Sequence, residues 1–151
     1  MTDNYSIEDG VMFQGFDVGI CQAATIIYPL TAVTLGLTTV ANCISVVQSS
    51  LVAQGMGVAM KYGVTGDYIP VLFYGIAKMF AGNAITAGQS IISGTTQTGM
   101  QGYVIANTAF SNATYYNAMA GLDGTGTAYI LGKCLQNSAS GDYSLCLINP
   151  I

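Results

Sequence analysis

The stretch IIYPLTAVTLGLTTVANCISVVQSSL, residues 26–51, has the clearest hydrophobic periodicity in the chain. Its large apolar residues recur in alternating steps of four and three positions, which is typical of a helix packed along its length on another helix. Eight positions form this predicted assembly seam: Ile26, Leu30, Val33, Leu37, Val40, Ile44, Val47 and Leu51. We therefore expect a long apolar helix here, with small neutral residues beside the seam.

A second apolar run follows a short turn with two glycines at residues 61–67. Its large residues fall on one face at helical spacing: Ile69, Leu72, Phe73, Ile76 and Phe80. Two long helices joined by so short a turn form an antiparallel hairpin. The layout is similar to that of conjugative pilins over residues 26–90, and this similarity is one of architecture alone.

The complete prediction is a mainly α fold in a single compact unit. An acidic N-terminal arm occupies residues 1–19, and the apolar helical hairpin occupies residues 20–93. Residues 94–151 form a Gly/Thr/Tyr-rich region, in which we expect a smaller helix within residues 95–121. Two short apolar segments at 128–136 and 143–149 flank a polar loop, which predicts a C-terminal β-hairpin.

The four cysteines give two different expectations. Cys134 and Cys146 lie symmetrically about the loop of the C-terminal hairpin, and cross-strand neighbours approach disulfide range, so we predict a disulfide between them. Cys21 and Cys43 are 22 residues apart. On one straight helix they would be separated by about 33 Å, so they can bond only if the chain folds back. Four buried free thiols are the alternative.

Charged side chains are scarce in this sequence. There are three Lys and seven Asp or Glu among 151 residues, and residues 18–60 and 79–122 carry none. With so few cations the chain cannot track a phosphate backbone, so we expect no nucleic-acid partner. A surface without mixed charges is typical of a protein that faces other copies of itself or lipid.

Catalytic chemistry has little to use here. The chain lacks His, and none of the three Lys lies in a recognisable motif with Ser. No pair of cysteines forms a C-x-x-C motif, and no Gly-rich stretch matches a P-loop. We therefore expect no enzyme activity, no catalytic residues, no metal, no cofactor and no small-molecule substrate.

These observations predict a structural subunit that acts by self-assembly. We expect a homo-oligomeric filament, pilus-like fibre or shell at the cell surface or outside the cell, held by hydrophobic helix packing. Its partners would be other copies of itself, with lipid as a further contact. One alternative is an integral membrane component of a secretion or transport assembly, with spans at residues 26–47 and 69–92. A second alternative is a viral coat or envelope protein.

Overall fold

The fold is all β. A computed structural model describes residues 3–7, 11–36, 43–49, 55–93, 102–106 and 130–150, with the backbone alone described for 3–7 and 11–16. These residues contain no helix, so the predicted mainly α fold with a helical hairpin is wrong. The strands are β1 (Asp3–Ile7), β2 (Val11–Ala23), β3 (Ala32–Leu35), β4 (Ile44–Gln48), β5 (Gly57–Ala59), β6 (Tyr68–Phe80), β7 (Ser90–Ser93), β8 (Val104–Ala106), β9 (Ile130–Cys134) and β10 (Tyr143–Ile148).

The composition of the quoted stretch explains why it forms strands. Eleven of the 26 residues from Ile26 to Leu51 are Ile, Val or Thr. Such β-branched side chains lose rotamer freedom in a helix and pack well on a pleated sheet. The second apolar run became the single 13-residue strand β6, whose residues from Tyr74 to Phe80 mostly alternate between exposed or half-buried and buried. The spacing of the apolar residues alone did not distinguish a helix from a strand in either run.

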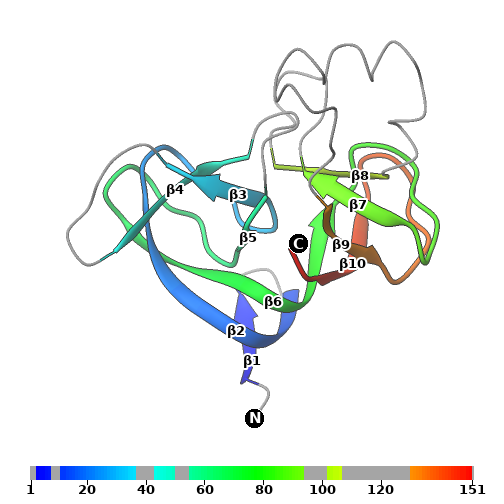
Figure 1. Ribbon diagram of the computed structural model, residues 1–151, viewed down its shortest axis with the longest axis horizontal. Coiled ribbons are helices and arrows are strands. Elements are labelled where there is room, and N and C mark those ends of the chain that lie inside the picture. The colour runs from blue at the N-terminus through cyan, green and yellow to red at the C-terminus, as the bar shows by residue number, and fades with distance from the viewer. Residues whose placement is uncertain are drawn as a thin grey trace.

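Five strands close into a ring, which we call the first unit. The strands follow one another in the order β2, β4, β3, β5 and β6, and β6 pairs with β2 to complete the ring. All of these pairings are antiparallel except that of β2 with β4, which is parallel. Figure 1 shows these strands on one side of the molecule, with the long strands β2 and β6 curving beneath them.

Strands β6 to β10 repeat the same topology, and we call them the second unit. Strand β6 continues out of the first unit and pairs with β10, which is followed by β9, β7 and β8. A parallel bridge between Ala81 and Val104 links the chain after β6 to β8. Each strand from β2 to β6 thus has a counterpart from β6 to β10, and β6 belongs to both units (Figure 1).

Backbone hydrogen bonds confirm the repeat position by position. Ala23 N donates to Asp67 O at 2.8 Å in the first unit, and Ala81 N donates to Asp142 O at 2.9 Å in the second. Three more contacts of the first unit have counterparts in the second. The bridge between Ile27 and Gly63 corresponds to that between Ile85 and Ser138. The hydrogen bonds Ala24 N to Val46 O and Leu30 N to Ala59 O correspond to Gly82 N to Val104 O and Gly88 N to Cys134 O.

The turn before the last strand of each unit shows the repeat in the sequence itself. Residues 66–68 and 141–143 both read Gly-Asp-Tyr. Gly66 and Gly141 have φ angles of 95° and 85°, in the left-handed region that glycine adopts without steric cost. The Asp67 carboxylate also accepts a hydrogen bond of 3.0 Å from Val64 N. The predicted turn at residues 61–67 is therefore present, and it has a counterpart 75 positions later.

The hydrophobic cores repeat as well. One core cluster fills the first unit with eight buried residues: Cys21, Ala23, Ile27, Val33, Val46, Ala59, Ile69 and Val71. Seven of their counterparts lie together in the second cluster: Met79, Ala81, Ile85, Ile91, Val104, Cys134 and Cys146. The eighth counterpart is Ser144, which is also fully buried. The second cluster also contains first-unit residues, among them Leu30, Ala32 and Val58, so it extends across both units.

Two further predictions concern the C-terminal region. Strands β9 and β10 pair antiparallel, so the two predicted C-terminal strands are present, although β10 also pairs with β6. Val104 to Ala106 form strand β8 within the segment where a smaller helix was expected, and that part of the prediction is wrong. The rest of that segment lies outside the described residues.

Candidate assembly surface

The eight seam residues do not share one face. In strand geometry neighbouring residues point to opposite sides, so the four-and-three spacing scatters the seam. Ile26 and Ile44 are exposed, Val47 is half-buried, and Leu30 and Val33 are buried. Leu37, Val40 and Leu51 lie outside the described residues. The seam is therefore not a helix-packing surface, and its described members are divided between core and surface.

The backbone bridge between Ile27 and Gly63 builds a different apolar surface. Ile27 points into the core with no exposed area, so its neighbours along the chain point outward. On the other segment Gly63 lies at the bridge, and its neighbours along the chain are also exposed. The outward residues are Ile26 and Tyr28 on one segment and Tyr62 and Val64 on the other, and we call these four the tyrosine strip.

The tyrosine strip is both apolar and exposed. The rings of Tyr28 and Tyr62 lie against each other, with centroids 5.7 Å apart and planes tilted by 58°. The four side chains are between 42 % and 54 % exposed. Contiguous exposed apolar side chains of this kind mark interaction surfaces more often than single exposed ones. Tyrosine suits such a surface because its ring packs while its hydroxyl stays hydrated.

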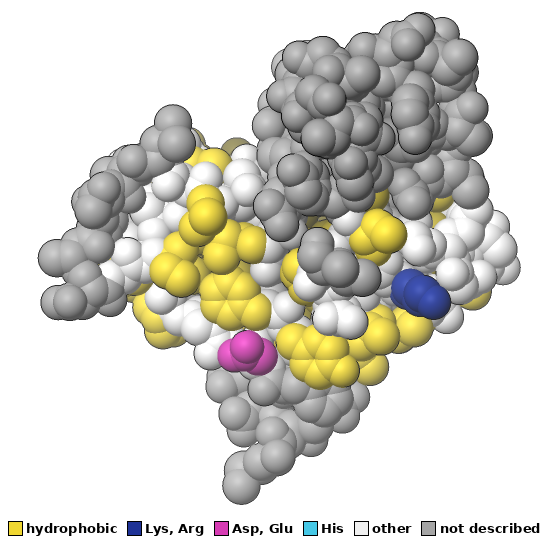
Figure 2. Space-filling view, in the orientation of Figure 1, with side chains coloured by type: hydrophobic (Ala, Val, Ile, Leu, Met, Phe, Trp, Pro, Cys, Tyr) yellow, Lys and Arg dark blue, Asp and Glu magenta, His cyan; other side chains and the backbone are white. Residues whose placement is uncertain are grey.

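Other exposed apolar residues lie in the same unit. Ile20 and Tyr68, each 60 % exposed, belong to the paired strands β2 and β6. Among the described residues, nine of the eleven exposed large hydrophobics fall between positions 20 and 74. Figure 2 shows hydrophobic side chains gathered in patches on one face of the molecule, where acidic and basic side chains are sparse.

The second unit does not repeat the tyrosine strip. Its counterparts, matched through the Ile85–Ser138 bridge, are Ala84, Thr86, Asn137 and Ala139. These are small or polar, and Asn137 Oδ1 accepts a hydrogen bond of 2.8 Å from Ala87 N. Since the same backbone tolerates polar residues in the second unit, the fold does not require the strip to be apolar.

An aromatic cluster occurs on the second unit instead. Phe80 stacks on Tyr103 with centroids 5.0 Å apart, and it contacts Tyr143 at 4.4 Å. Tyr143 is 42 % exposed, whereas Phe80 and Tyr103 are half-buried. This cluster is a smaller exposed surface than the tyrosine strip.

The structure brings the cysteines together in two pairs and has all four in the reduced, thiol form. Cys134 lies directly opposite Cys146 on β9 and β10, so the predicted disulfide partners are cross-strand neighbours. Cys43 lies beside β2, where its thiol donates to Ile20 O at 3.5 Å. Burial, reinforced by nearby Cys43, raises the pKa of Cys21 to about 11. The distance of about 33 Å between Cys21 and Cys43 applies only to a straight helix, and the described residues of this segment form no helix.

The part of the chain that the structure describes contains no group of three or more His, Cys, Asp and Glu side chains that could hold a metal ion. Over the same residues there is no helix of the length and apolarity needed to cross a membrane. Where they are described, the predicted spans at 26–47 and 69–92 consist of strands and the bridges, turns and irregular segments between them.

Comparison with known proteins gives one kind of match. The sequence matches no protein-family model and no curated protein. The fold is similar to that of the head fiber gp8.5 N base of bacteriophage phi29, with a TM-score of 0.59. The match covers 88 % of this chain and 93 % of that chain, at 14 % sequence identity. The likeness therefore concerns the fold, and it extends over nearly all of both chains.

Proposed function

We propose that this protein is a structural subunit of a virus particle of the phage type. The observation that carries the proposal is the fold, which resembles that of a phage head fiber base over 88 % of the chain. At this level of identity a shared fold does not define a shared role, so the chemistry of the surface provides the second argument.

That surface suits contact with other protein. Few charged side chains are present in the whole chain, and the first unit presents the tyrosine strip and further exposed apolar residues. Tyrosine is enriched at protein interfaces, whereas Lys and Glu are depleted there. The partners that we propose are other copies of this chain, which bury the tyrosine strip between them within a virion outside the cell.

Helix packing has no part in this proposal, because the described parts of the predicted helical hairpin contain strands and no helix. We propose a non-enzymatic role without nucleic acid, cofactor or small-molecule substrate, in keeping with the lack of His and Arg. The filament and pilus-like forms that depended on a helical hairpin are replaced by assembly through exposed side chains of a β fold.

Detection of the chain in purified particles tests the role directly. Virus particles from the source culture are separated on a density gradient, and each fraction is analysed for peptides of this chain by mass spectrometry. We expect the peptides in the fractions that contain intact particles, in constant ratio to the other particle proteins after a second gradient. Peptides confined to the soluble fractions would contradict a role in the virion.

A further inference from the structure

Cys134 and Cys146 form a pair of opposite residues on neighbouring strands. The antiparallel register of β9 and β10 sets them face to face. The next pair is Leu135 with Leu145, which is joined by a backbone hydrogen bond of 2.7 Å from Leu135 N to Leu145 O. Hydrogen-bonded and non-hydrogen-bonded pairs alternate along an antiparallel ladder. The two cysteines therefore occupy a non-hydrogen-bonded pair.

That position has the right dimensions for a disulfide. Cα atoms of a non-hydrogen-bonded pair are about 4.5 Å apart, and their side chains approach more closely than those of the other kind of pair. Disulfide-linked residues have Cα atoms about 4.4–6.8 Å apart. The spacing of two paired strands thus allows a bond between these cysteines without a shift of either backbone.

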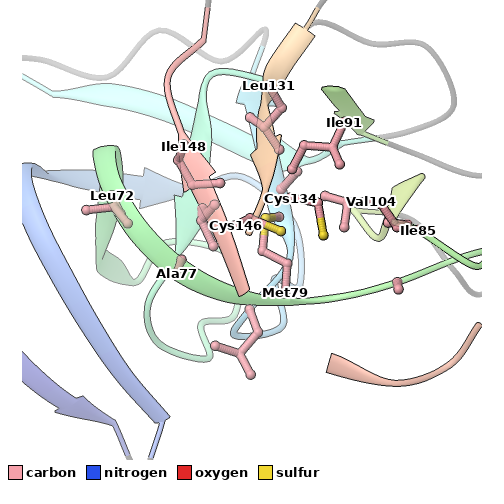
Figure 3. Close-up of a cluster of buried hydrophobic side chains, with 14 of the residues drawn as sticks. Leu72, Ala77, Met79, Ile85, Ile91, Val104, Leu131, Cys134, Cys146 and Ile148 are labelled. Atoms are coloured by element: carbon pink, nitrogen blue, oxygen red, sulfur yellow. The ribbon is translucent and has the colours of Figure 1, made fainter. Parts of the chain in front are cut away.

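Both thiols lie in the core of the second unit, as Figure 3 shows. Cys134 Sγ is within 2.8 Å of the buried hydroxyl of Ser144, and Cys146 Sγ donates to Ser144 O at 3.6 Å. Burial raises the pKa of the Cys146 thiol to about 12. Polar groups thus gather at a place where the surrounding side chains are apolar.

The first unit shows that packing does not require these groups. The counterparts of Cys134, Ser144 and Cys146 are Ala59, Ile69 and Val71, all apolar and buried. The second unit is also closed differently. Three consecutive residue pairs join β2 to β4 in the first unit. At the corresponding place in the second unit, the described residues contain one bridge, between Ala81 and Val104. A covalent link would strengthen the unit with the weaker closure.

We propose that Cys134 and Cys146 form a disulfide that crosslinks β9 to β10 and stabilises the second unit. Formation of the S–S bond removes one hydrogen from each thiol, as two electrons and two protons in total. A disulfide oxidant such as oxidised glutathione accepts them and is reduced to two thiols. The crosslink restricts the unfolded chain, which is the main source of stabilisation by a disulfide in the chain-entropy account.

The position of the last lysine makes the bond easy to detect. Trypsin cleaves after Lys133, so residues 134–151 contain both cysteines and are separated from Cys21 and Cys43. The full chain is refolded with oxidised glutathione, alkylated in denaturant and digested. We expect this peptide to carry no alkyl group and to be lighter by two hydrogen atoms than its dithiol form. The Tm should be about 5–10 °C higher than in the presence of a reductant.

Two variants separate the crosslink from effects on packing. The double variant Cys134→Ala with Cys146→Val copies the first-unit core, so it should fold and show a Tm that does not respond to reductant. Cys43→Ser should keep the response of the unaltered chain. A natively folded, oxidised chain whose C-terminal peptide takes up two alkyl groups would overturn the proposal, and so would a Tm that reductant leaves unchanged.

Discussion

At the scale of single residues, Ile26 and Ile27 are adjacent but have opposite environments. Ile27 has no exposed area, whereas Ile26 is half exposed as part of the tyrosine strip. A helix with the predicted seam would have buried Ile26, since it is the first seam position. The direction in which this pair points is therefore a test of strand geometry against helix geometry.

Alanine at each position should give very different costs. Ile27→Ala removes a fully buried side chain and should lower the free energy of unfolding by about 2–5 kcal/mol. Ile26→Ala changes a surface position and should stay within about 0.5 kcal/mol. Urea unfolding at low protein concentration, where self-association is weak, provides the comparison. Equal costs, or a larger cost at Ile26, would contradict the described strand face.

The thiols should differ in their reactivity for a similar reason. In the reduced protein, burial holds the pKa of Cys146 at about 12 against an ordinary value of 9.0. The thiolate is the nucleophile, so at pH 8 the reactive fraction of Cys146 should be roughly a thousandfold smaller than that of an ordinary thiol. With iodoacetamide and peptide mapping, we expect Cys43, which is partly exposed, to be alkylated well before Cys146. Alkylation of Cys146 first would show that its site opens readily.

At the scale of elements, the repeat places a glycine at the same point of β5 and β9. A Cβ on Gly57 would lie 2.6 Å from Leu72 O, and a Cβ on Gly132 would meet the counterpart carbonyl of Leu147 even more closely. Both contacts are with backbone atoms, which cannot rotate away. Glycine is therefore required where each of these strands crosses its neighbour.

Gly57→Ala and Gly132→Ala should each lower the free energy of unfolding by about 1–3 kcal/mol or more, because the added methyl group forces paired strands apart. Thermal or urea unfolding followed by circular dichroism measures the loss. Ala84→Ser, at an exposed position of the second unit, is the control and should stay within about 0.5 kcal/mol. If both glycine variants were as stable as this control, the described pairing of β5 with β6 and of β9 with β10 would be incorrect.

Elements also show how far the sequence could lead. The C-terminal strands were predictable because two short apolar segments flank one polar loop, so their pairing is local. The ring was not, because the four-and-three apolar spacing of residues 26–51 matches a helical period, and only the β-branched content of that stretch points to strands. The repeat was visible in the two Gly-Asp-Tyr turns. No single period describes the repeat, because β2 to β4 recur after 58 positions whereas β5 and β6 recur after 75.

At the scale of the whole molecule, strand β6 is shared by the two units. It supplies the last strand of the first unit and the first strand of the second, so loss of β6 would disrupt the strand pairing of both units. We expect a single unfolding transition, in which circular dichroism and tyrosine fluorescence give the same midpoint. Two transitions with separate midpoints would show that the units unfold independently.

We place the proposed contact between copies at the tyrosine strip, because the strip is exposed and apolar and has no equivalent in the second unit. Replacement of its exposed side chains should leave the core intact, because Ile27 occupies the interior side of the same bridge. The second unit offers a matched control at the same backbone positions, where Thr86 and Ala139 occupy the places of Tyr28 and Val64.

Sedimentation velocity over a range of protein concentrations tests this account most directly. We expect the unaltered chain to sediment as an oligomer, and the double variant Tyr28→Ser with Val64→Ser to sediment as a folded monomer with the circular dichroism of the unaltered chain. The control, Thr86→Ser with Ala139→Ser, should remain oligomeric. A monomeric unaltered chain at all concentrations, or a double variant that assembles as well as the control, would contradict assembly through the tyrosine strip.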